Sequence, residues 1–247
     1  MGEVTVWSPL ACIKNPQIEL NVALVILNSS LSETQDKLKS LWKTARFHIC
    51  ADGGANKLYQ TCGADKSFTP EYIAGDLDSV YKDVLLHYEK SGSKIAKFND
   101  QNSTDFEKCL KLISKHEKLT AEQFDVIYVL GSHGGRLDQS LAILNTLYKH
   151  TKTNETPLFL IAQDTLTFIL PPGRHKIYVN TGLEGSFCGL IPLGESCRCI
   201  STTGLAYNLS KHHLMFGSQI SSNNSFDGSD FVTVDTSDYI LWTMSTL

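Results

Sequence analysis

Residues 22–27 read VALVIL, six apolar residues in succession with no charge among them. A run of this kind is typical of a β-strand that is covered on both faces, as in a parallel sheet. Comparable short runs follow at 47–51, 72–74, 126–130 and 158–162. The stretches between them are longer and amphipathic, and strand–helix alternation at this spacing predicts a mostly parallel α/β sheet.

The stretches between these strands carry apolar residues at helical spacing. In one of them Phe106, Cys109 and Ile113 fall on the same stripe of a helix. We therefore expect helices at residues 31–44, 55–62, 80–90, 104–116 and 137–150, and a further short strand at 94–98.

The pattern of apolar and polar residues changes after Pro171-Pro172-Gly173. The remainder has short runs rich in Val, Ile, Thr and Phe, cut by glycine and serine, which predicts an all-β sandwich domain. We expect strands there at 176–179, 186–191, 198–202, 215–218, 231–234 and 240–244. The predicted organisation is a mostly parallel-sheet, nucleotide-binding α/β domain over residues 1–168, followed by the β-sandwich domain over residues 169–247.

Composition limits the classes of function. The 247 residues carry a formal net charge of −4 without a basic block, so the electrostatic footprint of a nucleic-acid binder is missing. No stretch approaches the roughly 18 consecutive apolar residues of a membrane span, and no signal peptide is expected. The seven cysteines form no Cys-x-x-Cys pair, which favours reduced thiols and a cytoplasmic protein.

Four of the predicted strands lead into polar segments in which an Asp stands beside a Gly or a hydroxyl residue. In open α/β sheets, ligands bind at the carboxyl ends of the strands, so these segments are candidates for one common site. They are ADGGAN at 51–56, GDLDS at 75–79, NDQNSTD at 99–105 and GSHGGRLDQ at 131–139.

Three carboxylates in these segments suit a divalent cation. Asp76 and Asp78 are separated by one residue, and Asp105 lies at the same predicted sheet edge; Mg²⁺ favours such oxygen ligands. A structural role is the alternative, because Asp78 or Ser79 can cap the helix at 80–90. Likewise Thr104 or Ser103 can cap the next helix, which leaves Asp105 in a first turn where the helix dipole favours it.

The segment 131–139 is the strongest candidate for a phosphate loop. Gly134 and Gly135 let backbone N–H groups approach an anion, and the planar fork of Arg136 can bind phosphate oxygens. The chain contains neither a Walker A motif nor G-x-G-x-x-G. In the β half, Ser201, Tyr207 and the segment 221–225 suit a heteroaromatic ligand, although such residues also dominate ordinary turns.

Together these segments resemble the eukaryotic thiamine pyrophosphokinase family over nearly the whole chain. The motifs that carry the resemblance are ADGGAN, GDLDS, QNSTDFEKCL at 101–110 and GGRLDQ at 134–139, followed by TGLEGSFCGLIP at 181–192, TTGLAYNL at 202–209, FDGS at 226–229 and LWTM at 241–244. The resemblance implies Mg²⁺-dependent transfer of a pyrophosphoryl group from ATP to the thiamine hydroxyl, with AMP as the leaving group. It also implies a homodimer whose active sites lie between subunits.

The resemblance also implies roles for single residues, carried over by position. Asp76, Asp78 and Asp105 look like the metal ligands and, with Arg136, like the catalytic set. The expected contacts of ATP and its phosphates are Asp52, Asn56, Gln101, Thr104, Asp138 and Gln139, and those of thiamine are Tyr207, Ser201 and Asn224. No general base is assigned.

Two residues depart from the family pattern. Tyr207 stands where animal relatives usually have Trp, which implies weaker stacking on thiamine, and Asn223 precedes Asn224 where Ser is expected. Alternative functions are a kinase of another heteroaromatic alcohol and a thiamine or nucleotide sensor that has lost catalysis. The sensor is disfavoured because all three carboxylates are retained, and an adaptor protein would leave the clustered aspartates to chance.

Overall fold

The structure is a computed structural model that describes residues 3–100 and 102–247. The chain divides into two compact units. We call residues 16–149 with 155–163 the α/β unit, and residues 3–15, 150–154 and 164–247 the β unit. Within the described residues, no helix combines the length and apolarity needed to cross a bilayer.

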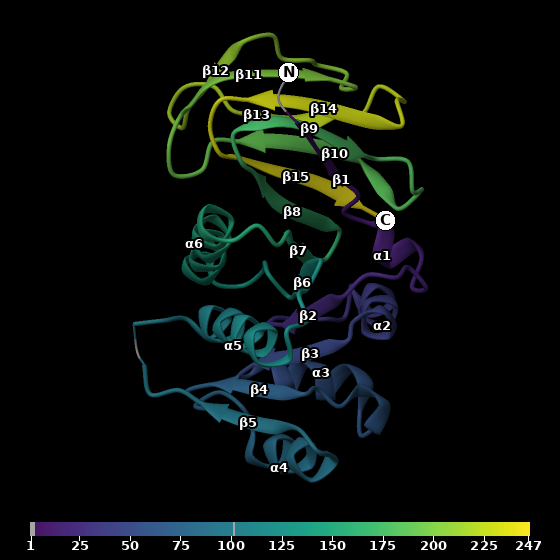
Figure 1. Cartoon of the computed structure of the whole chain (residues 1–247), viewed down its shortest axis with the longest axis vertical. Helices are drawn as coiled ribbons and strands as arrows, with labels where there is room; N and C mark the ends of the chain where they lie inside the picture. The colour runs from purple at the N-terminus through teal and green to yellow at the C-terminus, as the bar shows by residue number, and fades with distance from the viewer. Residues whose placement is uncertain (1–2, 101) are drawn as a thin grey trace. The chain divides into compact units, whose positions relative to one another are not determined.

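The α/β unit is built on a parallel sheet with strand order β7-β6-β2-β3-β4-β5. Its elements are β2 Val22–Ile26, α2 Gln35–Thr44, β3 Phe47–Ala51, α3 Gly54–Cys62, the 3₁₀ turn Lys66–Phe68, β4 Tyr72–Gly75, α4 Lys82–Ser91, β5 Lys94–Lys97, α5 Asp105–Thr120, β6 Val126–Leu130, most of α6 Leu137–Thr153, and β7 Leu158–Ala162. Helix α5 lies on one face of the sheet, and α2 and α3 lie on the other (Figure 1).

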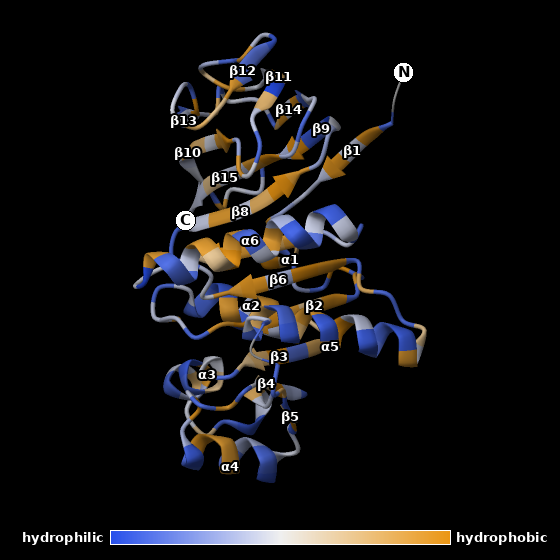
Figure 2. Cartoon of the chain, turned by 90° about the vertical axis from the view of Figure 1, so that its left-hand side faces the viewer, coloured by the Kyte–Doolittle hydropathy of each residue, from blue (hydrophilic) through white to orange (hydrophobic). Residues whose placement is uncertain are grey.

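The apolar runs become the central strands because they are covered on both faces. Every residue of β2, β3, β6 and β7 is buried. Strands β2 and β6 are orange along most of their length in Figure 2. Chain order reverses between β2 and β6, since β2 leads on to β3 while β6 leads on to β7. Such a switch point leaves a crevice at the carboxyl ends of the strands.

The β unit contains two arrays whose strands pair antiparallel, except for the parallel pair β1–β9, and together they give a sandwich. One is ordered β1-β9-β14-β11-β12, and the other contains β13-β10-β15-β8. Trp7 of β1 packs on Phe168 of β8 with ring centroids 5.0 Å apart, which joins the arrays. The elements are β1 Val4–Trp7, α1 Ala11–Lys14, β8 Thr165–Leu170, β9 Gly173–Tyr178, β10 Glu184–Ile191, β11 Cys197–Thr203, β12 His212–Leu214, β13 Ser221–Ser225, β14 Phe231–Thr236 and β15 Ile240–Thr246.

The predicted fold class is confirmed, and several predicted elements need correction. Residues 215–218 form a turn rather than a strand, with Gly217 at φ 82°. The helix expected from residue 31 begins only at Gln35. Strands β1, β8, β12 and β13 were not predicted. The domain boundary between residues 168 and 169 stays a prediction.

Candidate active site

A cavity of about 770 Å³ lies in the α/β unit at the switch point. Its walls are the loops that follow β2, β3, β4 and β6, together with the first turn of α5 and the start of α6. All of these segments meet at the carboxyl edge of the parallel sheet. The cavity is therefore where an α/β sheet binds its ligand.

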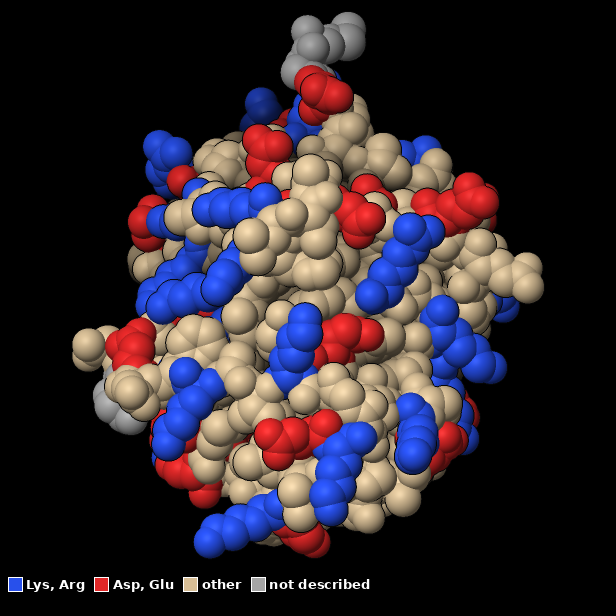
Figure 3. Space-filling model, turned by 60° about the horizontal axis from the view of Figure 1, so that its bottom comes forward, with Lys and Arg blue, Asp and Glu red and all other residues tan. Residues whose placement is uncertain are grey.

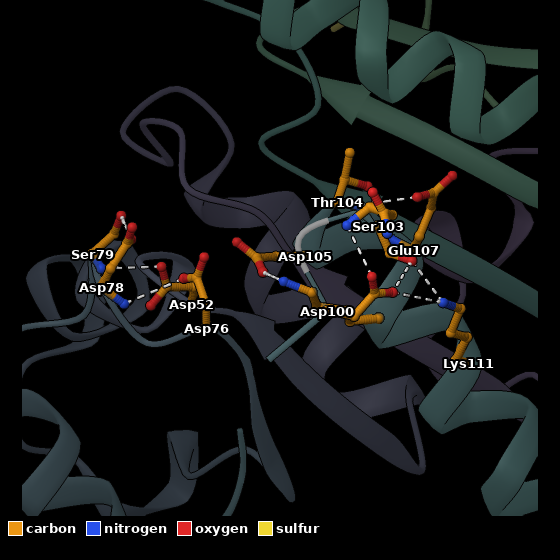
Figure 4. Close-up of polar contacts among 12 residues, drawn as sticks. Asp52, Asp76, Asp78, Ser79, Asp100, Ser103, Thr104, Asp105, Glu107 and Lys111 are labelled. Atoms are coloured by element: carbon orange, nitrogen blue, oxygen red, sulfur yellow. Dashed lines mark hydrogen bonds and ion pairs between the residues drawn. The ribbon is translucent and has the colours of Figure 1, made fainter. Parts of the chain in front are cut away.

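Three carboxylates, two from loops and one from the first turn of α5, meet in this cavity. Asp52, Asp76 and Asp105 each offer one oxygen, and these oxygens lie within 4.8 Å of one another. Figure 4 shows Asp52 and Asp76 side by side and Asp105 approaching from α5. Gly75 permits this approach, because a Cβ at this residue would lie 2.7 Å from Asp52 Cβ and 3.1 Å from Asp105 Oδ1.

The charges in this carboxylate group are partly compensated. Burial raises the pKa of Asp52, and the neighbouring Asp105 adds to this effect, against two backbone N–H groups that lower the pKa. Lys108, whose side chain is 3% exposed, donates from Nζ to Asp105 Oδ1 at 2.9 Å. Burial opposes the charge of Lys108, but this contact and the charges of Asp105, Asp76 and Asp100 together outweigh burial and raise the pKa of the ammonium. The buried cation therefore holds one carboxylate in place.

Asp78 lies outside the carboxylate group, although it lines the same cavity. Its Oδ1 accepts a hydrogen bond from Ser79 Oγ at 2.7 Å, and its backbone N–H donates to Asp76 Oδ1 at 3.3 Å. The capping interpretation of Asp78 and Ser79 is wrong, because α4 begins at Lys82 with Tyr81 as its N-cap. The aspartates of this loop are thus free of a helix-capping role.

The first turn of α5 has the expected cap. Thr104 is the N-cap and forms a capping box with Glu107: Thr104 Oγ1 accepts from the Glu107 N–H at 3.2 Å, and Glu107 Oε2 accepts from the Thr104 N–H at 3.0 Å. Thr104 also lines the cavity. Gln101, predicted to contact substrate, lies outside the described residues.

The glycine-rich loop after β6 forms the opposite wall. Gly134 and Gly135 have φ values of 117° and 75°, which few other residues adopt. The exposed Arg136 donates from Nε to Asp138 Oδ1 at 3.1 Å, and this contact lowers the pKa of the Asp138 carboxyl. Arg136 and Gln139 line the cavity, whereas Asp138 holds the guanidinium from outside it.

One wall of the cavity was not anticipated from the sequence. Asn28, Ser29 and Ser30 line it from the loop after β2, and Ser29 Oγ donates to the His133 carbonyl at 3.2 Å. This contact joins the loops on the two sides of the switch point. A signal was available, because these polar residues follow directly after the apolar run at 22–27.

The residues predicted to contact thiamine lie in the β unit. Tyr207 is 74% exposed, so its ring is available to a ligand. Asn224 is 3% exposed, and its amide is used by the backbone of Tyr207: Nδ2 donates to the carbonyl at 2.9 Å and Oδ1 accepts from the N–H at 3.2 Å. Ser201 Oγ accepts from the Lys211 N–H at 2.9 Å. Asn224 therefore holds Tyr207 rather than offering a free amide.

Comparison with known proteins agrees with this arrangement of an α/β enzyme unit and a β-sandwich unit. A family model described as "Thiamin pyrophosphokinase, catalytic domain" matches residues 38–160, and one described as "Thiamin pyrophosphokinase, vitamin B1 binding domain" matches residues 174–241. Thiamine pyrophosphokinase 1 of Arabidopsis thaliana is 36% identical over 236 residues, which are 90% of this chain and 85% of that protein. Thiamine pyrophosphokinase 2 of Oryza sativa subsp. japonica is 36% identical over 239 residues, with the same shares.

Solved structures give the same result. Thiamin pyrophosphokinase from Candida albicans aligns with a TM-score of 0.89 at 27% identity, covering 100% of this chain and 94% of that one. The yeast enzyme aligns with a TM-score of 0.86 at 25% identity, covering 99% and 92%. The chain belongs to the thiamin pyrophosphokinase family, and the resemblance inferred from its motifs is confirmed.

Proposed function

We propose that this chain transfers the pyrophosphoryl group of ATP to the hydroxyl of thiamine, giving thiamine diphosphate and AMP. The observation that carries the proposal is the meeting of Asp52, Asp76 and Asp105 in one cavity opposite a glycine-rich loop with Arg136. Transfer of a phosphoryl-type group depends on positioning and charge neutralisation more than on covalent chemistry. Membership in the thiamin pyrophosphokinase family supports the choice of substrates.

The carboxylate group fits a divalent cation, and we infer Mg²⁺. Three oxygens within 4.8 Å of one another form a hard donor set, and Mg²⁺ takes one or two carboxylates plus water and substrate phosphates. By geometry Asp52, Asp76 and Asp105 would hold the ion, with Asp78 beside them. Bound Mg²⁺ supplies charge neutralisation and polarises phosphate oxygens.

The other residues of the cavity bind and orient the polyphosphate. Arg136 binds phosphate oxygens through its guanidinium, while Asp138 keeps that group oriented. Thr104 and Gln139 line the same cavity and are proposed contacts of ATP. The predicted contact by Gln101 stays a prediction, and no residue is assigned as general base.

We propose that Tyr207 stacks on the thiamine ring and that Asn224 fixes the Tyr207 backbone. Ser201 remains a predicted contact. Because family resemblance implies active sites shared between subunits, we also propose a homodimer. A cytoplasmic location and two domains over residues 1–168 and 169–247 complete the proposal.

The test is phosphorus NMR of the purified protein with ATP, Mg²⁺ and thiamine, each omitted in turn. We expect AMP and thiamine diphosphate to appear together, and only when all three are present. ADP with thiamine monophosphate would instead identify an ordinary kinase. Thiamine binding without turnover would identify a sensor, and either result would overturn the proposal.

A further inference from the structure

Two buried side chains, Asp52 in the turn before α3 and Asn56 in the first turn of α3, bind the backbone of a neighbouring loop. Asp52 accepts from the Ser79 N–H at Oδ2 and from the Val80 N–H at Oδ1, both at 3.1 Å. Asn56 donates from Nδ2 to the Ser79 carbonyl at 2.8 Å and accepts from the Tyr81 N–H at Oδ1 at 2.9 Å. We call these four hydrogen bonds the α3 clamp.

The α3 clamp holds the loop 76–81, which carries Asp76 and Asp78. Asp52 and Asn56 are only 3% and 4% exposed, so their hydrogen bonds are shielded from water. The loop needs an external restraint, because Leu77 adopts φ 66°, which is unfavourable for a residue with a side chain. The N-cap of α4, Tyr81, makes no side-chain capping bond of its own, so the restraint comes from Asp52 and Asn56.

The two members of the clamp differ in what else they contact. Asp52 lines the cavity and belongs to the carboxylate group, but Asn56 does neither. Both polar atoms of the Asn56 amide are occupied by the backbone of residues 79 and 81. Any effect of Asn56 on the cavity must therefore travel through the loop 76–81.

We propose that Asn56, acting with Asp52, is a positioning residue that sets the affinity of the carboxylate group for a divalent cation. The inference rests on the proposed metal site and deepens it. It replaces the expectation that Asn56 contacts the nucleotide. Residues that orient metal ligands through hydrogen bonds change metal affinity about 10- to 100-fold when they are lost.

The experiment compares full-length wild-type protein with Asn56→Ala. Alanine keeps the helix propensity of α3 and removes both hydrogen bonds to the loop. We expect Mn²⁺, followed by electron paramagnetic resonance as the probe, to bind about tenfold more weakly. We also expect the Ser79, Val80 and Tyr81 amides to exchange hydrogen faster, and the Mg²⁺ concentration at half-maximal turnover to rise more than the maximal rate falls.

Ser93→Ala is the matched control. Ser93 is 6% exposed and donates to the Pro70 carbonyl at 2.6 Å, but it precedes β5 at the amino edge of the sheet. The Ser93→Ala variant loses a buried side-chain hydrogen bond but leaves the loop 76–81 untouched, so its affinity for Mn²⁺ should equal that of wild type. Asn56→Asp keeps an acceptor for the Tyr81 N–H but turns a carboxylate oxygen toward the Ser79 carbonyl, so it too should bind Mn²⁺ more weakly than wild type.

The possible outcomes distinguish the positioning role of Asn56 from the proposed metal site. Unchanged Mn²⁺ affinity in a folded Asn56→Ala protein, while wild type binds Mn²⁺, would overturn the positioning role and leave the metal site standing. A wild-type protein that binds no Mn²⁺ would remove the metal site and this role with it. If Asn56→Ala does not fold, Asn56→Asp and exchange of wild-type amides decide: unprotected amides at residues 79–81 would overturn the clamp.

Discussion

Gly75→Ala tests whether the three carboxylates must meet as closely as they do. Gly75 ends β4 without a left-handed φ, so alanine can adopt its backbone conformation. The added Cβ would lie 2.7 Å from Asp52 Cβ, whereas carbon atoms pack at about 3.5–4.0 Å, so Asp52 must retreat by about 1 Å. A displacement of about 1 Å costs on the order of 100-fold in rate, and overpacking costs about 1–3 kcal/mol of stability.

The assay is kcat for thiamine diphosphate formation at saturating Mg²⁺, with the free energy of unfolding measured in urea. Gly92→Ala is the control, because Gly92 ends α4 at φ 109° and a Cβ there meets no atom within 4 Å. Its strained backbone should cost about 1–2 kcal/mol of stability with no change in kcat. A Gly75→Ala protein with wild-type kcat and the stability loss of Gly92→Ala would refute the reasoning.

Three further outcomes are expected. Asp76→Asn should weaken Mn²⁺ binding far more than Asp78→Asn, because only Asp76 belongs to the carboxylate group; equal losses in a titration would favour the ligand set inferred from the sequence. Tyr207→Ala should raise the KM for thiamine more than the KM for ATP, and Tyr207→Trp should lower it; steady-state kinetics with an unchanged thiamine KM would remove the ring from the site. His175 accepts from Trp7 Nε1 at Nδ1 and donates from Nε2 to the Pro171 carbonyl, so the fold requires neutral imidazole, and burial lowers its pKa below 6.5. The unfolded chain then binds the proton more readily, so stability should be full above about pH 6.5 and fall below it; a Tm profile as flat as that of His175→Gln would contradict this.

The central strands were predictable because burial on both faces leaves a local signature. The run at 22–27 became β2 Val22–Ile26, and the run at 126–130 became β6 with the same limits. Strand β13 was not predictable this way, because its residues, SSNNS, are polar and are held by pairing with β10. Residues 215–218 misled the prediction, since Met215 and Phe216 are 41% and 61% exposed in a turn.

The charged residues likewise show what the sequence predicts and what it does not. The even distribution of charge along the chain predicted no basic block, and Figure 3 shows Lys and Arg interspersed with Asp and Glu on the face it views. The burial of a charged side chain was beyond the sequence, however. That Lys108 would be buried against Asp105 depends on how α5 packs on the sheet, and only the folded structure contains that packing.

The sequence by itself determined the class of fold, the family and the loops that carry the chemistry, because hydrophobic periodicity and strand-end motifs are local properties. The tertiary structure decided which carboxylates meet. Spacing along the chain pairs Asp76 with Asp78, but Asp52, 24 residues earlier by its number, completes the group. The physical reason is the parallel sheet: it brings the carboxyl ends of distant strands to one edge, while neighbours along one loop can point apart.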